Sequence, residues 1–159
     1  PAGVWQQFAA KKASAMAGVP DWTVSAMDAG AQVDILPADI YFKSMAQAIL
    51  ASDETIAKNP QLIQKLVRAT LKGMKDIMAN PKEAAAAYVQ HVPAHKGKEA
   101  NIQSVFEMYN KYVYSSQKVL GQMDEVRLGE LQKFYVTNAV VPKETPLKDL
   151  YTNQFVMAK

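Results

Sequence analysis

The sequence predicts an α/β fold that is rich in helices. Between positions 60 and 78, apolar residues return every three to four positions, which is the period of a helix with one buried face. Positions 32–50 instead carry isoleucines, aromatic residues and partial alternation, which favours one or two strands. Positions 1–5 are interpreted as the end of a strand that leads directly into a helix, as in a segment cut from an α/β domain.

The first fifty residues are predicted to contain one helix and the extended segment. A helix is expected over positions 6–17 and should stop at Gly18. Positions 19–30 are predicted to form a loop with Trp22 as its large anchor. Pro37 confines a strand in the extended segment to a sheet edge or a kink, because proline has no amide to donate.

The middle of the chain carries the clearest helix signals. Ser52 is predicted to cap a short helix, and Asn59 with Pro60 opens a long one. On the long helix, Leu66 and Val67 are expected to be buried. Gly73 is expected at a close helix contact, because glycine inside a helix costs about 1 kcal/mol relative to alanine.

Three more helices are predicted after a second Asn-Pro pair at positions 80 and 81. The first is alanine-rich and ends before Pro93, and the second covers positions 98–116. Asp124 should cap the third helix, which has an apolar stripe of its own. A linker over 142–146 and a final turn over 147–151 complete the chain.

Composition excludes several classes of function. The 159 residues are 49% hydrophobic and 21% charged, which suits one globular core, and no apolar run approaches the length of about 18 residues that spans a membrane. The absence of cysteine excludes disulfides and thiolate metal sites. The net charge of +3 is spread along the chain without a basic cluster, which disfavours nucleic acid as a partner.

No pattern for catalysis or metal binding stands out. His91 and His95 are four positions apart, but Pro93 between them breaks the helix that would place both rings on one face. Surface loop histidines are therefore the favoured interpretation. The nucleophile elbow and the phosphate loop are absent as motifs, so no catalytic residue, metal ligand or cofactor is predicted.

Three blocks of sequence, in order, resemble a known family. They are Ala51–Asn80, in which one Asn-Pro pair starts at 59 and the residue that ends the block begins a second pair at 80–81, then GQMDEVRLGELQKFYVTNAVV at 121–141, and DLYTNQFV at 149–156. They are similar to the C-terminal half of periplasmic substrate-binding proteins of ABC importers for nitrate, sulfonates, taurine and thiamine-pyrimidine precursors. Ala46 and Gln47 depart from the glycine and asparagine common in that family.

This resemblance implies the helix-rich C-terminal portion of a two-lobed type II periplasmic binding protein fold. Positions 1–30 would end the second lobe, 31–50 would form a crossover strand segment, and 51–159 would return as helices to complete the first lobe. The partners implied are a small solute, the N-terminal half of the same protein and an ABC permease, and the place is the periplasm or another extracytoplasmic, membrane-associated site. No nucleic acid is expected.

The function implied is capture of a small, anionic or heteroaromatic solute in a cleft between lobes, without catalysis. Trp5 and Tyr41 are the candidate ligand contacts, since both lie beside expected strand ends or crossovers, where open α/β sheets bind ligands; burial is the alternative for each. Tyr109, Tyr112 and Tyr114 are assigned to core packing. Two rival functions remain: an enzyme like the thiamine-pyrimidine synthases, which share the fold, and a helical protein-interaction module.

Overall fold

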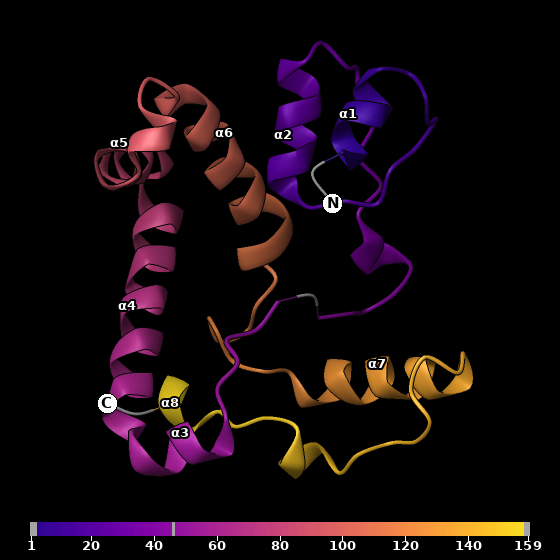
Figure 1. The fold of residues 1–159 in the computed structure, drawn as a ribbon, viewed down its shortest axis with the longest axis vertical. Helices are drawn as coiled ribbons and strands as arrows, with labels where there is room; N and C mark the ends of the chain where they lie inside the picture. Colours follow the sequence, from indigo (N-terminus) through magenta and orange to yellow (C-terminus); the bar gives the residue numbers. More distant parts are fainter. Residues whose placement is uncertain (1–2, 46, 158–159) are drawn as a thin grey trace. The chain divides into compact units, whose positions relative to one another are not determined.

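The computed structural model describes residues 3–45 and 47–157, which form helices joined by irregular segments (Figure 1). The helix-rich character is confirmed. No strand occurs in the described residues, so the strands expected over 32–50 are not observed. A strand end is also expected over positions 1–5, but a helix begins at Val4. Pro1 and Ala46 lie outside the described residues. In residues 43–45 and 47–51, no backbone amide or carbonyl forms a hydrogen bond with another backbone group.

The chain divides into two compact units, which are described separately. The first comprises Pro1–Leu36 and Gly73–Ser116, and the second comprises Pro37–Lys72 and Gln117–Lys159. Each unit is therefore assembled from segments that lie far apart in the sequence. No helix in the described part of the chain is both long enough and apolar enough to cross a membrane.

In the first unit, two helices at the start differ from those predicted. Helix α1 (Val4–Ala9) ends well before residue 17, and Lys11 just beyond it has a left-handed φ of 59°. Helix α2 (Pro20–Asp28) occupies most of the stretch predicted to be a loop. Pro20 is its first residue, where the missing amide costs nothing, and Val19 before it is extended.

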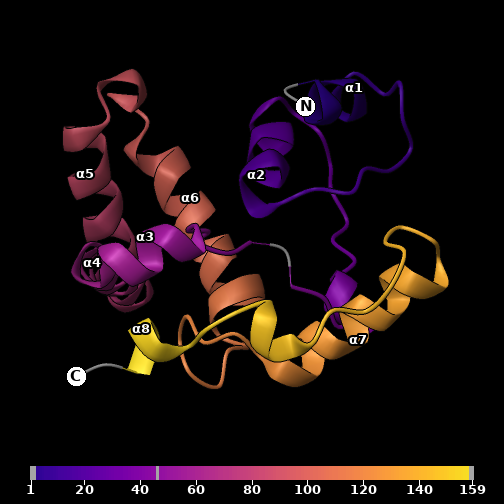
Figure 2. The same cartoon turned by 60° about the horizontal axis from the view of Figure 1, so that its bottom comes forward.

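Helices α5 (Pro81–His91) and α6 (Glu99–Tyr109) form the core of the first unit, lying side by side in both views (Figures 1 and 2). The short 3₁₀ turn η2 (Pro93–His95) connects them. Asn80 caps α5 as predicted, since its side chain accepts a hydrogen bond from the amide of Glu83. Helix α6 also packs against α2. The buried residues of the core are Ala85, Val89 and Ile102, with Tyr88 and Phe106 packed against them.

A π-helical turn, η3 (Asn110–Tyr114), continues α6 within the helix predicted over 98–116. A π turn places residues five apart on one face, whereas an α-helix places residues three and four apart there. Tyr109 and Tyr114 accordingly stack with their ring centroids 5.7 Å apart. The side-chain amide of Asn110 donates to the carbonyl of Ile77 at 3.0 Å and so ties this turn to the end of α4.

The second unit contains α3 (Asp53–Lys58) and the first part of α4 (Pro60–Ala79). Ser52 caps α3 as predicted, accepting from the amide of Thr55 at 3.1 Å. On α4, Val67 is buried together with Ile63, but Leu66 is 49% exposed, so the prediction that Leu66 is buried is wrong. The buried residues Ile63 and Val67 are four positions apart, so the buried stripe of α4 is narrower than the set of apolar residues in its sequence. Leu66 lies at the edge of this buried stripe.

Helix α7 (Glu125–Thr137) is the other long element of the second unit, and Asp124 caps it as predicted by accepting from the amides of Val126 and Arg127. The 3₁₀ turn η4 (Leu147–Asp149) and α8 (Gln154–Met157) follow. Two glutamine side chains form hydrogen bonds to the backbone of the segment that follows α7. Gln132 bonds both backbone groups of Thr145 at 2.7 and 2.9 Å, and Gln64 donates to the carbonyl of Phe155 at 2.9 Å.

Gly73 on α4 is not at a close contact, because a Cβ there would meet no heavy atom within 4 Å. We therefore expect Gly73→Ala to stabilise the protein by about 1 kcal/mol, through lower chain entropy in the unfolded state. Thermal unfolding followed by circular dichroism measures the change. Gly121→Ala is the opposite control, since Gly121 has a φ of +80° and its Cβ would collide with Leu71. A loss of stability in Gly73→Ala would contradict the open site.

Candidate functional site

Trp5, the first predicted ligand contact, lies half-buried on α1 in the first unit. A hollow of about 640 Å³ adjoins the end of the same helix, lined by Phe8, Lys11, Ser14 and Gln32 among others. Trp5 does not line this hollow. The structure thus places Trp5 in a partly covered position outside this hollow.

Tyr41, the second predicted contact, belongs to the second unit and directly follows the 3₁₀ turn η1 (Ala38–Ile40). Its side chain is 75% exposed, and that of the neighbouring Ile40 is 72% exposed. Burial, the alternative for Tyr41, does not apply in this unit. Two adjacent apolar side chains are therefore offered to solvent at one turn.

The guanidinium group of Arg127 on α7 forms hydrogen bonds to this turn. Its two terminal nitrogens bond the two carboxylate oxygens of Asp39, with Nη2 to Oδ2 at 2.9 Å, and Nη1 also reaches the carbonyl of Ser44 at 3.3 Å. Lys43 adds an ion pair to Asp39 at 3.0 Å. The hydrogen bond from Arg127, followed by that from Lys43, outweighs partial burial and lowers the pKa of Asp39 to about 2.

An aromatic contact holds the other side of the turn. The ring of Phe42 packs on that of Phe134 of α7, with centroids 4.6 Å apart. We call residues 38–44 the clamped turn: Asp39, Phe42 and Ser44 are each held by α7, while Ile40 and Tyr41 project away. Sequence reasoning did not find this arrangement. The available signal was that Arg127 is one of only two arginines in the chain.

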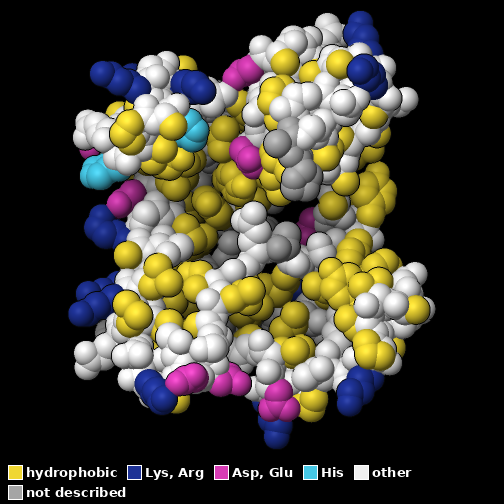
Figure 3. Space-filling model, viewed as in Figure 1, with side chains coloured by type: hydrophobic (Ala, Val, Ile, Leu, Met, Phe, Trp, Pro, Cys, Tyr) yellow, Lys and Arg dark blue, Asp and Glu magenta, His cyan; other side chains and the backbone are white. Residues whose placement is uncertain are grey.

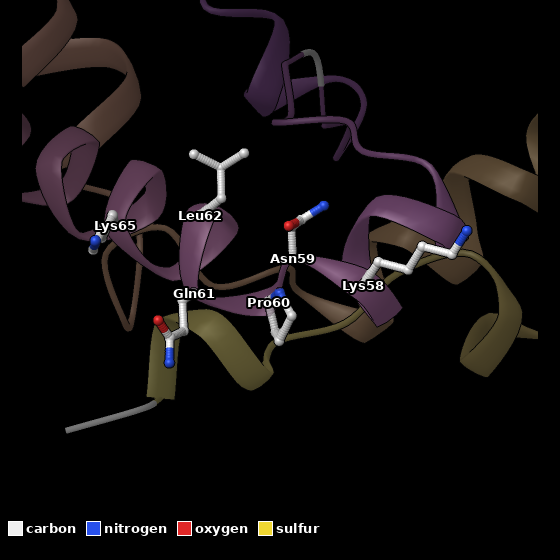
Figure 4. A pocket seen from close by; sticks show the side chains of 6 residues that line it. All are labelled: Lys58, Asn59, Pro60, Gln61, Leu62 and Lys65. Atoms are coloured by element: carbon white, nitrogen blue, oxygen red, sulfur yellow. The ribbon is translucent and has the colours of Figure 1, made fainter.

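A smaller hollow, of about 410 Å³, lies at the junction of α3 and α4, also in the second unit. Figure 4 shows that its side chains point to different sides of the junction rather than toward one place. Lys58 already pairs with Glu54 at 2.7 Å. The hollow therefore lacks the convergent polar groups that mark a binding site.

In the first unit, Tyr109 forms a half-buried polar cluster with Asp21 and Tyr114. Its hydroxyl donates to the Asp21 carboxylate at 3.3 Å. Burial, then the charge and hydrogen bond of Asp21, raise the pKa of Tyr109 from 10.0 to about 12. The assignment of these tyrosines to packing accounts for the stack but not for this bond to α2.

The raised pKa of Tyr109 predicts a loss of stability at high pH. Folding favours the protonated phenol, so its contribution is complete below pH 10 and is lost as pH rises toward about 12. Urea unfolding across this range, followed by tryptophan fluorescence, measures the loss. Tyr109→Phe should flatten the curve and Asp21→Asn should reduce its slope. A Tyr109→Phe variant that keeps the native pH dependence would contradict this origin.

Comparison with known proteins now supplies a family. The protein-family model described as "NMT1/THI5 like" matches residues 2–84, just over half of the chain. The chain belongs to the NMT1/THI5-like family. This family has the periplasmic binding protein fold, and its match includes the clamped turn and both candidate contacts.

Among curated proteins, this NMT1/THI5-like chain is similar to the riboflavin-binding protein RibY of Chloroflexus aurantiacus. The two are 28% identical over 131 residues, which is 80% of this chain and 37% of RibY. The chain thus spans little more than a third of the length of that relative. No solved structure matches it. Family and relative together fit a role in binding a small-molecule solute.

Proposed function

We propose that this chain is part of the solute-binding component of an ABC import system, and that its solute is a small heteroaromatic molecule of the flavin type. The similarity to RibY over 80% of the chain is the observation that carries the proposal. Exposed Tyr41 supports it chemically, because a tyrosine ring offers a flat face on which a planar ring system can stack.

In this proposal the chain does not catalyse a reaction. It is the C-terminal half of a two-lobed receptor, with residues 1–30, 31–50 and 51–159 as second-lobe end, crossover and helical return. The N-terminal half of the same protein supplies the opposite wall, and closure delivers the solute to a permease at an extracytoplasmic membrane face. Trp5 is retained as a second candidate contact in its own unit.

Binding measurements test the solute class. Calorimetry of the chain with riboflavin, nitrate, taurine, an alkanesulfonate and a pyrimidine precursor should give heat with riboflavin above all others. Tyr41→Ala should weaken that binding about tenfold, the loss of about 1.4 kcal/mol of stacking. Tyr135→Ala is the matched control, since Tyr135 is an exposed tyrosine of the same unit on α7.

An enzyme is the second candidate, because the family description also names THI5. A synthase would convert a precursor rather than release it unchanged. Incubating the chain with a pyridine or pyrimidine precursor and analysing the products by mass spectrometry separates the two. A new product that depends on the chain would replace the receptor proposal; unchanged precursor would favour it.

A further inference from the structure

We infer that Arg127 and Asp39 are positioning residues whose bidentate ion pair holds the backbone of the turn that carries Tyr41, and that Tyr41 is a contact for a planar solute. This inference rests on the proposed function and deepens it by naming the groups that set the geometry of the contact. Neither Arg127 nor Asp39 touches the solute. They act through the clamped turn.

The first step of the argument is the rigidity of the turn. Arginine is planar and presents paired donors that match both oxygens of a carboxylate, so the pair fixes direction as well as distance. Arg127 meets both oxygens of Asp39 and also bonds the Ser44 carbonyl, so one side chain grips the two ends of the turn. Inside the turn, the amides of Tyr41 and Phe42 both donate to the carbonyl of Ala38, at 2.9 and 2.8 Å.

The second step concerns what the clamp leaves outside. Phe42 is anchored on Phe134, and no ring contact to Tyr41 occurs in the described part of the chain. Exposed apolar side chains are numerous on this protein, as the face in Figure 3 shows, and they occur both on helices and in irregular segments. Ile40 and Tyr41 differ because anchored residues flank them on both sides.

The third step is energetic. When a ligand binds a flexible side chain, the loss of conformational entropy lowers the affinity. The cost is about 0.5 to 1.5 kcal/mol for one flexible side chain, and it is greater if the backbone must also be ordered. A turn already fixed by Arg127 avoids the backbone part of that cost, while the exposed Tyr41 side chain still has to be ordered. An exposed aromatic face favours flat ring systems over compact anions, for which a ring face is not a hydrogen-bond donor.

The test uses two conservative variants and a matched control. Arg127→Lys keeps the positive charge but removes the paired guanidinium donors, and Asp39→Asn keeps the shape of the side chain but removes its negative charge. Arg68→Lys is the control, because Arg68 is exposed on α4 and forms no ion pair among the described residues. Hydrogen exchange at the amides of residues 40–42 reports the clamp, and the riboflavin-induced NMR shift of the Tyr41 ring reports solute contact.

We expect both clamp variants to exchange these amides about tenfold faster and to weaken the riboflavin effect at Tyr41 by a similar factor, since one charged hydrogen bond corresponds to about that change. Arg68→Lys should alter neither readout. Unchanged exchange in both variants would show that there is no clamp. Faster exchange with an unchanged riboflavin effect would overturn the positioning role.

Failure of the proposed function gives a different pattern. If riboflavin moves no Tyr41 resonance in the native chain while the clamp variants still exchange faster, the clamp exists but its surface is not a solute contact. That result overturns the inference and the heteroaromatic solute together.

Discussion

Ile102→Ala is expected to destabilise the first unit by about 2 to 5 kcal/mol. Ile102 is only 8% exposed and packs in the cluster formed by α5 and α6. Truncation removes buried methyl groups and leaves a cavity that two helices cannot fully close. Denaturant unfolding followed by tryptophan fluorescence measures the loss selectively, because Trp5 and Trp22 both belong to this unit.

Met27→Ala is the matched control for the core truncation. Met27 lies on α2 in the same unit but is 49% exposed, so its truncation should cost less than about 1 kcal/mol. Equal losses in the two variants would mean that the α5–α6 cluster does not dominate the stability of this unit. A loss below half a kcal/mol in Ile102→Ala would have the same meaning.

The second large effect concerns affinity. We expect the 159-residue chain to bind riboflavin about a thousandfold more weakly than full-length RibY does. Tyr41 is three-quarters exposed, so a ring stacked on it keeps its other face in water. Each hydrogen bond that the opposite wall would make to the neutral ring contributes about 0.5 to 1.5 kcal/mol, and the loss of about four of them amounts to about 4 kcal/mol, which is a thousandfold in affinity.

Calorimetry of both proteins under the same buffer conditions measures this difference, with RibY as the positive control. Micromolar binding by the chain alone would overturn the half-receptor proposal and would require a self-contained site. The two hollows described above, at α1 and at the α3–α4 junction, would then be the first places to substitute.

Local signals predicted the helices well wherever a cap accompanied the apolar pattern. Ser52, Asn80 and Asp124 each cap the helix that was expected to follow. Helix α2 lies where the sequence predicts a loop, although Pro20 opens it as Pro81 opens α5, because proline is common both in loops and in the first turn of a helix. The period of α4 was correct, but the depth of burial at Leu66 was not, since burial depends on neighbours that a helical pattern does not specify.

The extended segment and the site show a different limit. Strand propensity over 32–50 reflects side chains suited to a sheet, and a sheet needs partner backbones that the described residues do not provide. The sequence predicts Tyr41 as a ligand contact, and that role stays a prediction. The clamp on it could not be foreseen, because Asp39 and Arg127 are brought together only by the fold.

The π turn after α6 also has a consequence for how this sequence tolerates changes in length. One turn of a π-helix holds one residue more than a turn of an α-helix, so deleting a single residue within 110–114 allows the segment to close into regular α-helix. The backbone ladder would survive such a deletion at 110–113, and Tyr114 would then follow Tyr109 by four positions, a spacing that also places two side chains on one face of an α-helix. Homologues one residue shorter here are therefore expected to be able to keep both tyrosines, at a spacing of four positions in place of five.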